Sequence, residues 1–271
     1  LLDTSISFYD KNGDTFLQKA LLLNRMKRNR DAREACDRLL ELEPGNFWGY
    51  VNRMEACLAL KEGQGVIDDF YRAKKIFVSY PPLYEMTAEV FDSAGQYEDV
   101  LDIIKQAENE KISTPRLSLF RLRACSRQAK TIGEAEKVLD DASRVLADLE
   151  DTRKNAEIRG EIYAEAARIQ NNMGDGKAAL AYINRALAQD GRPIFKWMKG
   201  NILFDLERFQ EALQVLVSCE KDFPEGDMVM FRIGECYQRV GGMEEAAEYF
   251  KRTLEIDPQN RRANSKLAEI Y

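Results

Sequence analysis

The sequence predicts an all-α protein built from stacked antiparallel helix pairs. Three observations support this fold class. A period of about 34 residues runs through the chain, each period holds two apolar-periodic segments of helical length, and a short break separates those segments.

Two independent sets of positions carry the period. Gly234 matches Gly200 at 34 residues, Ala246 matches Ala212 at the same distance, and Ala179 lies 33 residues before Ala212. The same interval links positions in the N-terminal half, where the last step of the first series is 35 residues: Ala32, Val66, Val100 and Ala135 in one series, and Ala20, Met54, Ala88 and Leu122 in the other. The repeat is therefore a property of the whole chain.

Each period reads as a helix-turn-helix unit. The breaks between its two helices include "GGM", "SAGQ" and "NMGDG", and several units end near proline, at Pro44, Pro224 and Pro258. Glycine ends the first helix and proline stops the second. Small residues at the matched positions allow the two helices to approach closely. A single pair leaves one apolar face uncovered, so neighbouring pairs must stack.

The last unit, "DMVMFRIGECYQRVGGMEEAAEYFKRTLEIDP", resembles the tetratricopeptide repeat family. Gly234, Tyr237, Ala246, Phe250 and Pro258 stand at the signature places of that family, and the unit departs from it in having Thr253 for alanine and no early tryptophan. The resemblance implies a right-handed superhelical solenoid forming one array over residues 1–271. We expect a lead segment at 1–12, seven repeats at 13–46, 47–80, 81–114, 115–158, 159–192, 193–226 and 227–260, and a capping or truncated helix at 261–271.

One interval breaks the period. From Ala135 to Ala179 the chain runs 44 residues, keeps helical patterning and contains no proline. We expect lengthened helices around 134–174. They fit either a local change in superhelical pitch, which we favour, or a projection for docking or dimerisation.

Composition limits the function classes. The 271 residues carry 40 basic and 46 acidic side chains, which gives a net charge of -6 and disfavours binding to a nucleic-acid backbone. No apolar stretch is long enough to span a bilayer, so we expect a soluble protein without membrane insertion. The five cysteines form no CxxC pair and favour a reducing compartment, which predicts a cytoplasmic location.

Chemical motifs are absent. The chain has no histidine, the commonest general base, and no P-loop, GxGxxG or GxSxG sequence. The segment "DKNGDTFLQKAL" at 10–21 resembles an EF-hand start, but Thr15 replaces the required glycine and Leu21 the bidentate glutamate. We expect a turn before a helix that starts near Asp14. No metal, cofactor or catalytic residue is predicted.

In the resembled family, the first helices of successive repeats line a concave groove that binds extended peptides. The register places Trp48, Asn52 and Glu55 there in the second repeat. The main predicted site is C-terminal and consists of Trp197, Asn201, Phe231, Arg232, Arg239, Arg262 and Lys266. A secondary basic strip consists of Arg116, Phe120, Arg123 and Arg127, beside the acidic residues Glu85, Glu89 and Asp92. These two strips either bind a ligand or pair with each other.

The C-terminal set is similar to the carboxylate clamp of chaperone-binding family members. It departs from that clamp at two positions. Trp197 takes the place of the first lysine, beside Asn201, and Arg232 takes the place of the middle asparagine. Guanidinium groups bind carboxylates bidentately, so the site fits an acidic or C-terminal carboxylate segment, with Trp197 and Phe231 as apolar anchors. The alternative is that these side chains pack against neighbouring helices.

The function predicted from sequence is a scaffold or adaptor that binds partner proteins or extended peptides without catalysis. Self-association is also compatible with the pattern. One alternative is the helical regulatory or substrate-recruiting region of a larger multidomain enzyme or co-chaperone. An RNA-binding helical repeat is disfavoured because its groove should be basic.

Overall fold

The computed structural model describes residues 12–271, and the predicted lead segment at 1–12 lies outside these residues except for Asn12. The described part contains fifteen α-helices, one short 3-10 turn and no strand. The chain divides into two compact units, residues 1–128 (unit 1) and 129–271 (unit 2). The boundary falls inside the predicted fourth repeat, 115–158.

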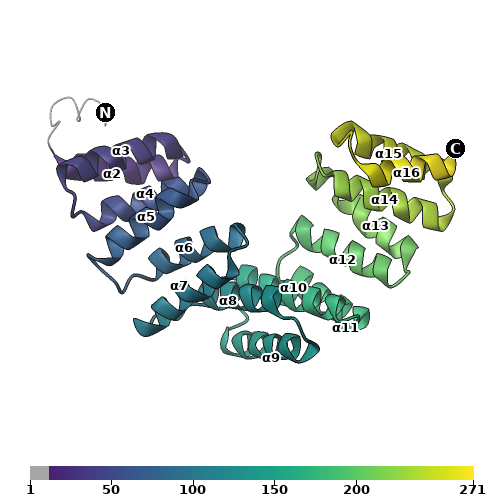
Figure 1. Ribbon diagram of the computed structural model, residues 1–271, viewed down its shortest axis with the longest axis horizontal. Coiled ribbons are helices and arrows are strands. Elements are labelled where there is room, and N and C mark those ends of the chain that lie inside the picture. The colour runs from purple at the N-terminus through teal and green to yellow at the C-terminus, as the bar shows by residue number, and fades with distance from the viewer. Residues whose placement is uncertain (1–11) are drawn as a thin grey trace. The chain divides into compact units, whose positions relative to one another are not determined.

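Unit 1 is a stack of consecutive helices. Its helices are α2 (Gly13–Arg25), α3 (Asn29–Leu42), α4 (Phe47–Ala59), α5 (Gly63–Lys74), α6 (Pro81–Ser93), α7 (Tyr97–Asn109) and α8 (Pro115–Gln128). Each helix packs on the next in the chain, as Figure 1 shows from α2 to α8. Helices α2, α4, α6 and α8 also contact one another in that order, so the first helices of successive pairs share one face of the unit.

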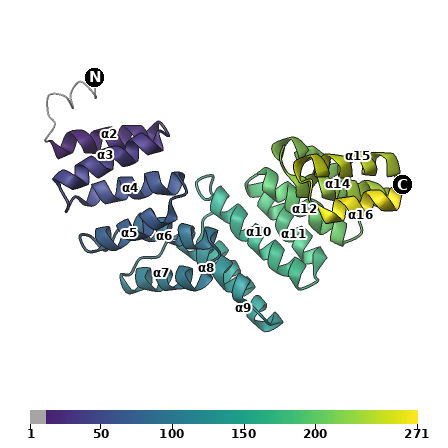
Figure 2. The ribbon, with the colours of Figure 1, turned by 45° about the horizontal axis from the view of Figure 1, so that its top comes forward.

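Unit 2 repeats this arrangement. Its helices are α9 (Ile132–Asp148), α10 (Ala156–Asn172), α11 (Gly176–Gln189), α12 (Pro193–Asp205), α13 (Phe209–Cys219), α14 (Asp227–Val240), α15 (Met243–Ile256) and α16 (Arg261–Ile270), with the 3-10 turn at Glu220–Asp222. Consecutive helices from α9 to α16 pack together (Figure 2), and α12 contacts both α10 and α14.

The helices at the irregular interval are lengthened, as the sequence predicts. Helices α9 and α10 have 17 residues each. The side chain of Arg159 on α10 donates to the backbone oxygens of Leu146 and Leu149, at 3.1 and 2.6 Å, and these carbonyls lie at the C-terminal end of α9. A buried cation at that end satisfies carbonyls that have no intrahelical partner and complements the helix dipole. Arg159 thereby fixes the α9–α10 connection.

The turns inside the helix pairs share one geometry. In six of them a residue in the left-handed region follows the end of the first helix. The N–H of the next residue donates to the backbone oxygen five positions before it, which is the Schellman arrangement. Glycine was expected at these breaks, and that is correct for only half of them. The left-handed residues are Lys27, Lys61, Gly95, Gly174, Glu207 and Gly241.

Side-chain caps start several helices. Asn12 Oδ1 accepts a hydrogen bond from the N–H of Asp14 at 3.0 Å, and α2 begins at Gly13. The expected turn before a helix is therefore confirmed at this end of the EF-hand-like segment, whose Asp10 lies outside the described residues. Thr131 and Glu134 form a capping box at the start of α9, each side chain accepting from the other residue's N–H.

The close approach of paired helices depends on the small residues that carry the period. A Cβ atom on Gly234 would lie 2.7 Å from the ring of Phe250, which is completely buried between α14 and α16. Thr253, where the resembled family has alanine, is also buried, and its hydroxyl donates to the carbonyl of Tyr249 at 2.9 Å. The hydroxyl of Thr253 is thus satisfied within its own helix.

A buried ion pair links three helices of unit 1. Arg53 on α4 donates twice to Asp69 on α5, at 2.7 Å each, and once to Asp37 on α3, at 2.6 Å. Asp69 is only 2% exposed. Burial alone would lower the pKa of Arg53, but the hydrogen bonds and charges of Asp69 and Asp37 outweigh it and raise that pKa. The guanidinium therefore stays charged and holds α3, α4 and α5 in register.

Replacing Gly234 with alanine should destabilise unit 2. The added methyl group must displace the Phe250 ring, and overpacking of this kind costs about 1–3 kcal/mol, from which a gain of about 1 kcal/mol in helix propensity is subtracted. We expect a net loss of up to about 2 kcal/mol in the free energy of unfolding by urea. Gly133→Ala is the matched control, because nothing lies within 4 Å of its Cβ position. Equal stability of the two variants would contradict this packing argument.

Removing Arg53 should be costly. Arg53→Met leaves the buried Asp69 carboxylate with only the exposed Arg72 as a cationic partner, at 3.3 Å. Breaking one side of a buried pair costs about 3–5 kcal/mol, and we expect a loss near the lower end, read from urea unfolding by circular dichroism. The Arg53→Met, Asp69→Leu double variant should recover most of it. A double variant as unstable as the single one would contradict the ion-pair explanation.

Candidate partner-binding faces

Helix α12 supplies the first part of the predicted C-terminal site. Trp197, Asn201 and Phe204 follow at intervals of four and three residues, so they share one face of the helix. The Asn201 amide donates to the backbone oxygen of Trp197 at 2.9 Å, which fixes its orientation. Trp197 and Phe204 are partly buried against the core between α12, α13 and α14. This face turns toward α14.

Two arginines meet one carboxylate across α14 and α16. The Arg232 guanidinium lies 3.1 Å from one carboxylate oxygen of Glu235, and the Arg262 guanidinium lies 3.5 Å from the other. Glu235 is largely buried, with 13% of its side chain exposed, whereas Arg262 is 68% exposed. We refer to Arg232, Glu235 and Arg262 as the arginine face of unit 2.

Aromatic rings hold both guanidinium groups. Arg232 lies 4.5 Å from the ring centroid of Phe204, and Arg262 lies 4.6 Å from that of Phe231. Cation–π contacts restrict the rotamers of long arginine side chains, so both groups are positioned before a partner arrives. The repeat register places Glu235 among the groove positions of this unit, although the predicted site leaves it out, and Phe204 was not predicted at all. The spacing of Glu235 three residues after Arg232 on one helix was the signal available for the first of them.

The remaining residues of the predicted site are dispersed. Phe231 is 6% exposed and packs against Phe250, so it supports Arg262 and offers little ring surface to a ligand. Arg239 stacks on Phe209 at 4.2 Å, near the opposite end of α14. Lys266 pairs with Glu269 at 2.7 Å, and this contact lowers the pKa of Glu269. The structure thus brings Arg232 and Arg262 together and leaves Arg239 apart.

The acidic and basic strips of unit 1 pair with each other. Arg116 on α8 lies 2.8 Å from Glu89 on α6, and Arg123 lies 3.2 Å from Asp92. Phe120 is buried, with Arg116 and Arg123 each 5.9 Å from its ring centroid. Arg127, one turn further along α8, is exposed. These contacts favour the internal-pairing alternative for the secondary strip.

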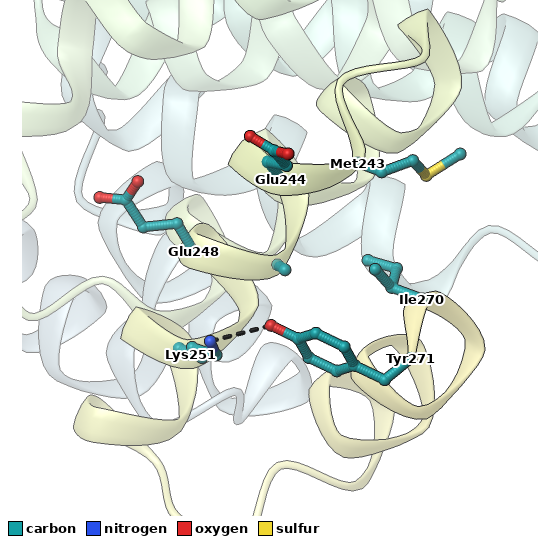
Figure 3. A pocket seen from close by; sticks show the side chains of 7 residues that line it. Met243, Glu244, Glu248, Lys251, Ile270 and Tyr271 are labelled. Carbon is teal, nitrogen blue, oxygen red and sulfur yellow. Dashed lines mark hydrogen bonds between the residues drawn. The ribbon is translucent and has the colours of Figure 1, made fainter.

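A shallow pocket in unit 2 shares no lining residue with either predicted site. It has a volume of about 430 Å³ and lies between α15 and α16, lined by Met243, Glu244, Ala247, Glu248, Lys251, Ile270 and Tyr271. Figure 3 shows Met243 and Ile270 on one side and the Lys251 ammonium pointing to the Tyr271 hydroxyl on the other, at 2.9 Å. That hydrogen bond raises the pKa of Lys251.

Four of the five cysteines are core residues, and Cys125 is half-buried. Four are buried, namely Cys36, Cys57, Cys219 and Cys236. Burial raises the pKa of the Cys36 and Cys236 thiols to about 12 and that of Cys57 to about 11. The described residues hold no cluster of three or more side chains that could ligate a metal ion. Among them, no helix is both long and apolar enough to cross a membrane.

Comparisons with known proteins agree with this architecture. Residues 164–217 and 198–261 match the family model described as tetratricopeptide repeat. No curated protein matches the sequence. The fold of the chain is similar to that in the crystal structure of the APC/C hetero-tetramer Cut9-Hcn1, with a TM-score of 0.75 and 13% identity. That match covers 99% of this chain and 51% of the other, so the chain spans about half its length.

Two further structures share the fold. A tetratricopeptide repeat protein from Parabacteroides merdae has a TM-score of 0.69 and 14% identity, with 95% of this chain and 98% of the other covered. PilW, described as a widely conserved type IV pilus biogenesis factor, has a TM-score of 0.63 and 16% identity, with 78% and 94% covered. At these identities the similarity establishes the fold alone.

The buried thiols should resist alkylation. At pH 8 a thiol with a pKa of about 12 is ionised in about one molecule in ten thousand, and the packed core blocks access as well. We expect iodoacetamide at pH 8 to leave Cys36 and Cys236 unmodified in the folded protein and to modify both in urea, as read by peptide mass spectrometry. Rapid native labelling of either residue would contradict their placement in the core.

Proposed function

We propose that this chain, a tetratricopeptide-repeat protein of about seven repeats and a C-terminal helix, is a non-catalytic scaffold for partner proteins or extended peptides. We further propose that the arginine face of unit 2 recognises an acidic segment or a C-terminal carboxylate of the partner. The fold supports the general part of this proposal, since it places the first helices of successive pairs on one shared face. Structures of the same fold include Cut9-Hcn1, a hetero-tetramer, and PilW, a pilus biogenesis factor.

One observation supports the acidic partner. Two guanidinium groups are held on aromatic rings and share a single carboxylate, Glu235, so the face keeps an excess positive charge. Arg262 makes only the longer of the two ion pairs and is largely exposed. Its unused N–H groups can bind a partner carboxylate in the bidentate geometry that guanidinium favours. Trp197 is partly buried on the same face of α12 as Phe204, the ring that contacts Arg232.

Glu235 has two opposing effects at the arginine face. Its mostly buried carboxylate forms an ion pair with Arg232 and reduces the repulsion between the two guanidinium groups in the free protein. The same charge competes with the partner's carboxylate for Arg262. Glu235 should therefore make binding weaker and reversible, and its removal should strengthen binding.

Replacement of Arg262 should weaken binding of an acidic peptide. The protein has two tryptophans, so incorporation of 5-fluorotryptophan gives two ¹⁹F NMR signals, which Trp197→Phe and Trp48→Phe variants assign. We expect an N-acetylated Glu-Glu-Glu-Asp peptide with a free C-terminus to shift the Trp197 signal saturably. Loss of one charge-assisted hydrogen bond corresponds to about 1.5–3 kcal/mol, so Arg262→Gln should raise the Kd about tenfold or more. Glu235→Gln should lower it.

The controls separate recognition from general electrostatics. Arg144→Gln removes an exposed arginine from α9, where it pairs with Asp141, and should leave the Kd unchanged. The neutral counterpart, a Gln-Gln-Gln-Asn peptide amide, should not bind. If the neutral peptide binds equally well, or if Arg262→Gln and the parent protein have the same Kd, the arginine face does not read acidic segments.

A further inference from the structure

A cluster of hydrogen-bond acceptors lies on the face that the first helices of unit 1 share. Asn24 on α2 donates through its amide to the backbone oxygen of Asn52 at 2.9 Å and to the carboxylate of Glu55 at 3.4 Å. The Asn52 amide donates to the backbone oxygen of Trp48 at 2.8 Å. These contacts fix both amide groups with their nitrogens used inside the protein. Their oxygens are therefore the atoms left for something else.

Both amide oxygens are buried without a hydrogen-bond partner in the described part of the chain. Asn52 is only 2% exposed. A buried acceptor that stays unsatisfied costs about 1–3 kcal/mol, so native structures rarely keep one without a reason. Two such oxygens on adjacent helices indicate a place where a donor group is received.

The neighbouring carboxylate is also uncompensated. Glu89 and Asp92, on the same shared face, each pair with an arginine of α8, whereas Glu55 contacts no cationic side chain among the described residues and receives only the weak hydrogen bond from Asn24. Burial by the surrounding helices raises the pKa of Glu55, and the Asn24 hydrogen bond opposes this rise only in part. A cation beside Glu55 would remove the cost of keeping it charged.

Aromatic rings border the acceptor cluster. Trp48 lies one helical turn before Asn52 on the same face of α4 and is 49% exposed, although its ring packs edge-on against Tyr80 and Phe47, with centroids 5.5 and 5.3 Å apart. Tyr80 lies close enough to Glu55 that the carboxylate charge contributes to raising the pKa of its hydroxyl, after burial itself. Trp48 and Glu55 are seven residues apart on α4, which places them on the same face of that helix.

We infer that Asn24, Trp48, Asn52, Glu55 and Tyr80 form a recognition site for an arginine side chain of an extended partner segment. Guanidinium carries only donors, five in one plane, and therefore matches a site that offers only acceptors and one carboxylate. It also stacks on aromatic rings, for which the exposed face of Trp48 is available. The inference rests on the proposed scaffold function in one respect, namely that the arginine belongs to a polypeptide. It concerns the shared face of unit 1 instead of the arginine face of unit 2, and a positively charged instead of a negatively charged partner group.

The two tryptophan signals make the test direct. The probe is a blocked peptide, acetyl-Gly-Ala-Arg-Ala-Gly-amide, titrated into protein labelled with 5-fluorotryptophan, and its neutral counterpart contains citrulline in place of arginine. We expect the arginine peptide to shift the Trp48 signal saturably with a Kd below about 1 mM, and the citrulline peptide to bind at least fivefold more weakly. A lysine peptide should bind with intermediate affinity because ammonium lacks the planar fork.

Matched variants locate the site. Glu55→Gln keeps the size of the side chain and removes its charge, and we expect it to weaken arginine binding at least fivefold. Glu98→Gln removes a charge from an exposed position on α7 and should leave the Kd unchanged. Unchanged circular dichroism and urea midpoints for both variants would show that folding is intact.

The possible results either support or overturn the inference. Absence of saturable binding at several millimolar peptide, equal binding of arginine and citrulline peptides, or an unaffected Glu55→Gln variant would each overturn it and leave water as the donor to the two amide oxygens. The proposed scaffold function is judged separately in the same sample, because the acidic peptide is read at Trp197. Loss of one response with retention of the other distinguishes the two proposals.

Discussion

The close approach of paired helices is the constraint on which the rest of the structure depends. Gly234 admits the ring of Phe250, and Gly200 admits the side chain of Leu216, at positions where a Cβ atom would lie within 3 Å of the neighbour. Paired helices at this distance leave their outer apolar faces uncovered, so each pair needs the next one. Stacking then brings the first helices of successive pairs into contact, from α2 through α4 and α6 to α8 in unit 1 and from α10 through α12 to α14 in unit 2, which creates the shared face of each unit.

Stacking also decides which charges can be used for recognition. Side chains on adjacent first helices meet, as Glu89 on α6 and Arg116 on α8 do, and such pairs are satisfied inside the protein. Only charges and hydrogen-bonding groups that lack a full complement of internal partners remain available for recognition. The Asn24–Glu55 contact leaves acceptors without donors in unit 1, whereas Glu235 leaves two guanidinium groups with one carboxylate in unit 2. The partner segments proposed for the two faces therefore carry opposite charges.

The sequence predicts the helix pairs well because small and apolar residues of the core carry the period, and their spacing follows directly from packing. It predicts the turns only partly, since Lys27, Lys61 and Glu207 adopt the left-handed conformation that glycine usually marks. The Schellman hydrogen bonds hold them there, and these depend on where the helix ends. Site residues were harder to predict. The register places Glu235 on the same face as Arg232, but the role of Arg232 also depends on Phe204, which the periodic pattern alone does not connect to it.

This division explains how the fold can persist at 13% identity with a TM-score of 0.75. Helical backbone groups bond within each helix, so the fold demands specific residues at few positions beyond the small and apolar ones of the core. The shared faces can change freely, since replacing a surface side chain leaves the stack intact. Partner choice in such a protein is consequently a property of its unbalanced side chains, and relatives with the same fold carry no information about it. For this chain the unsatisfied oxygens of Asn24 and Asn52 and the shared carboxylate of Glu235 are therefore the appropriate starting points.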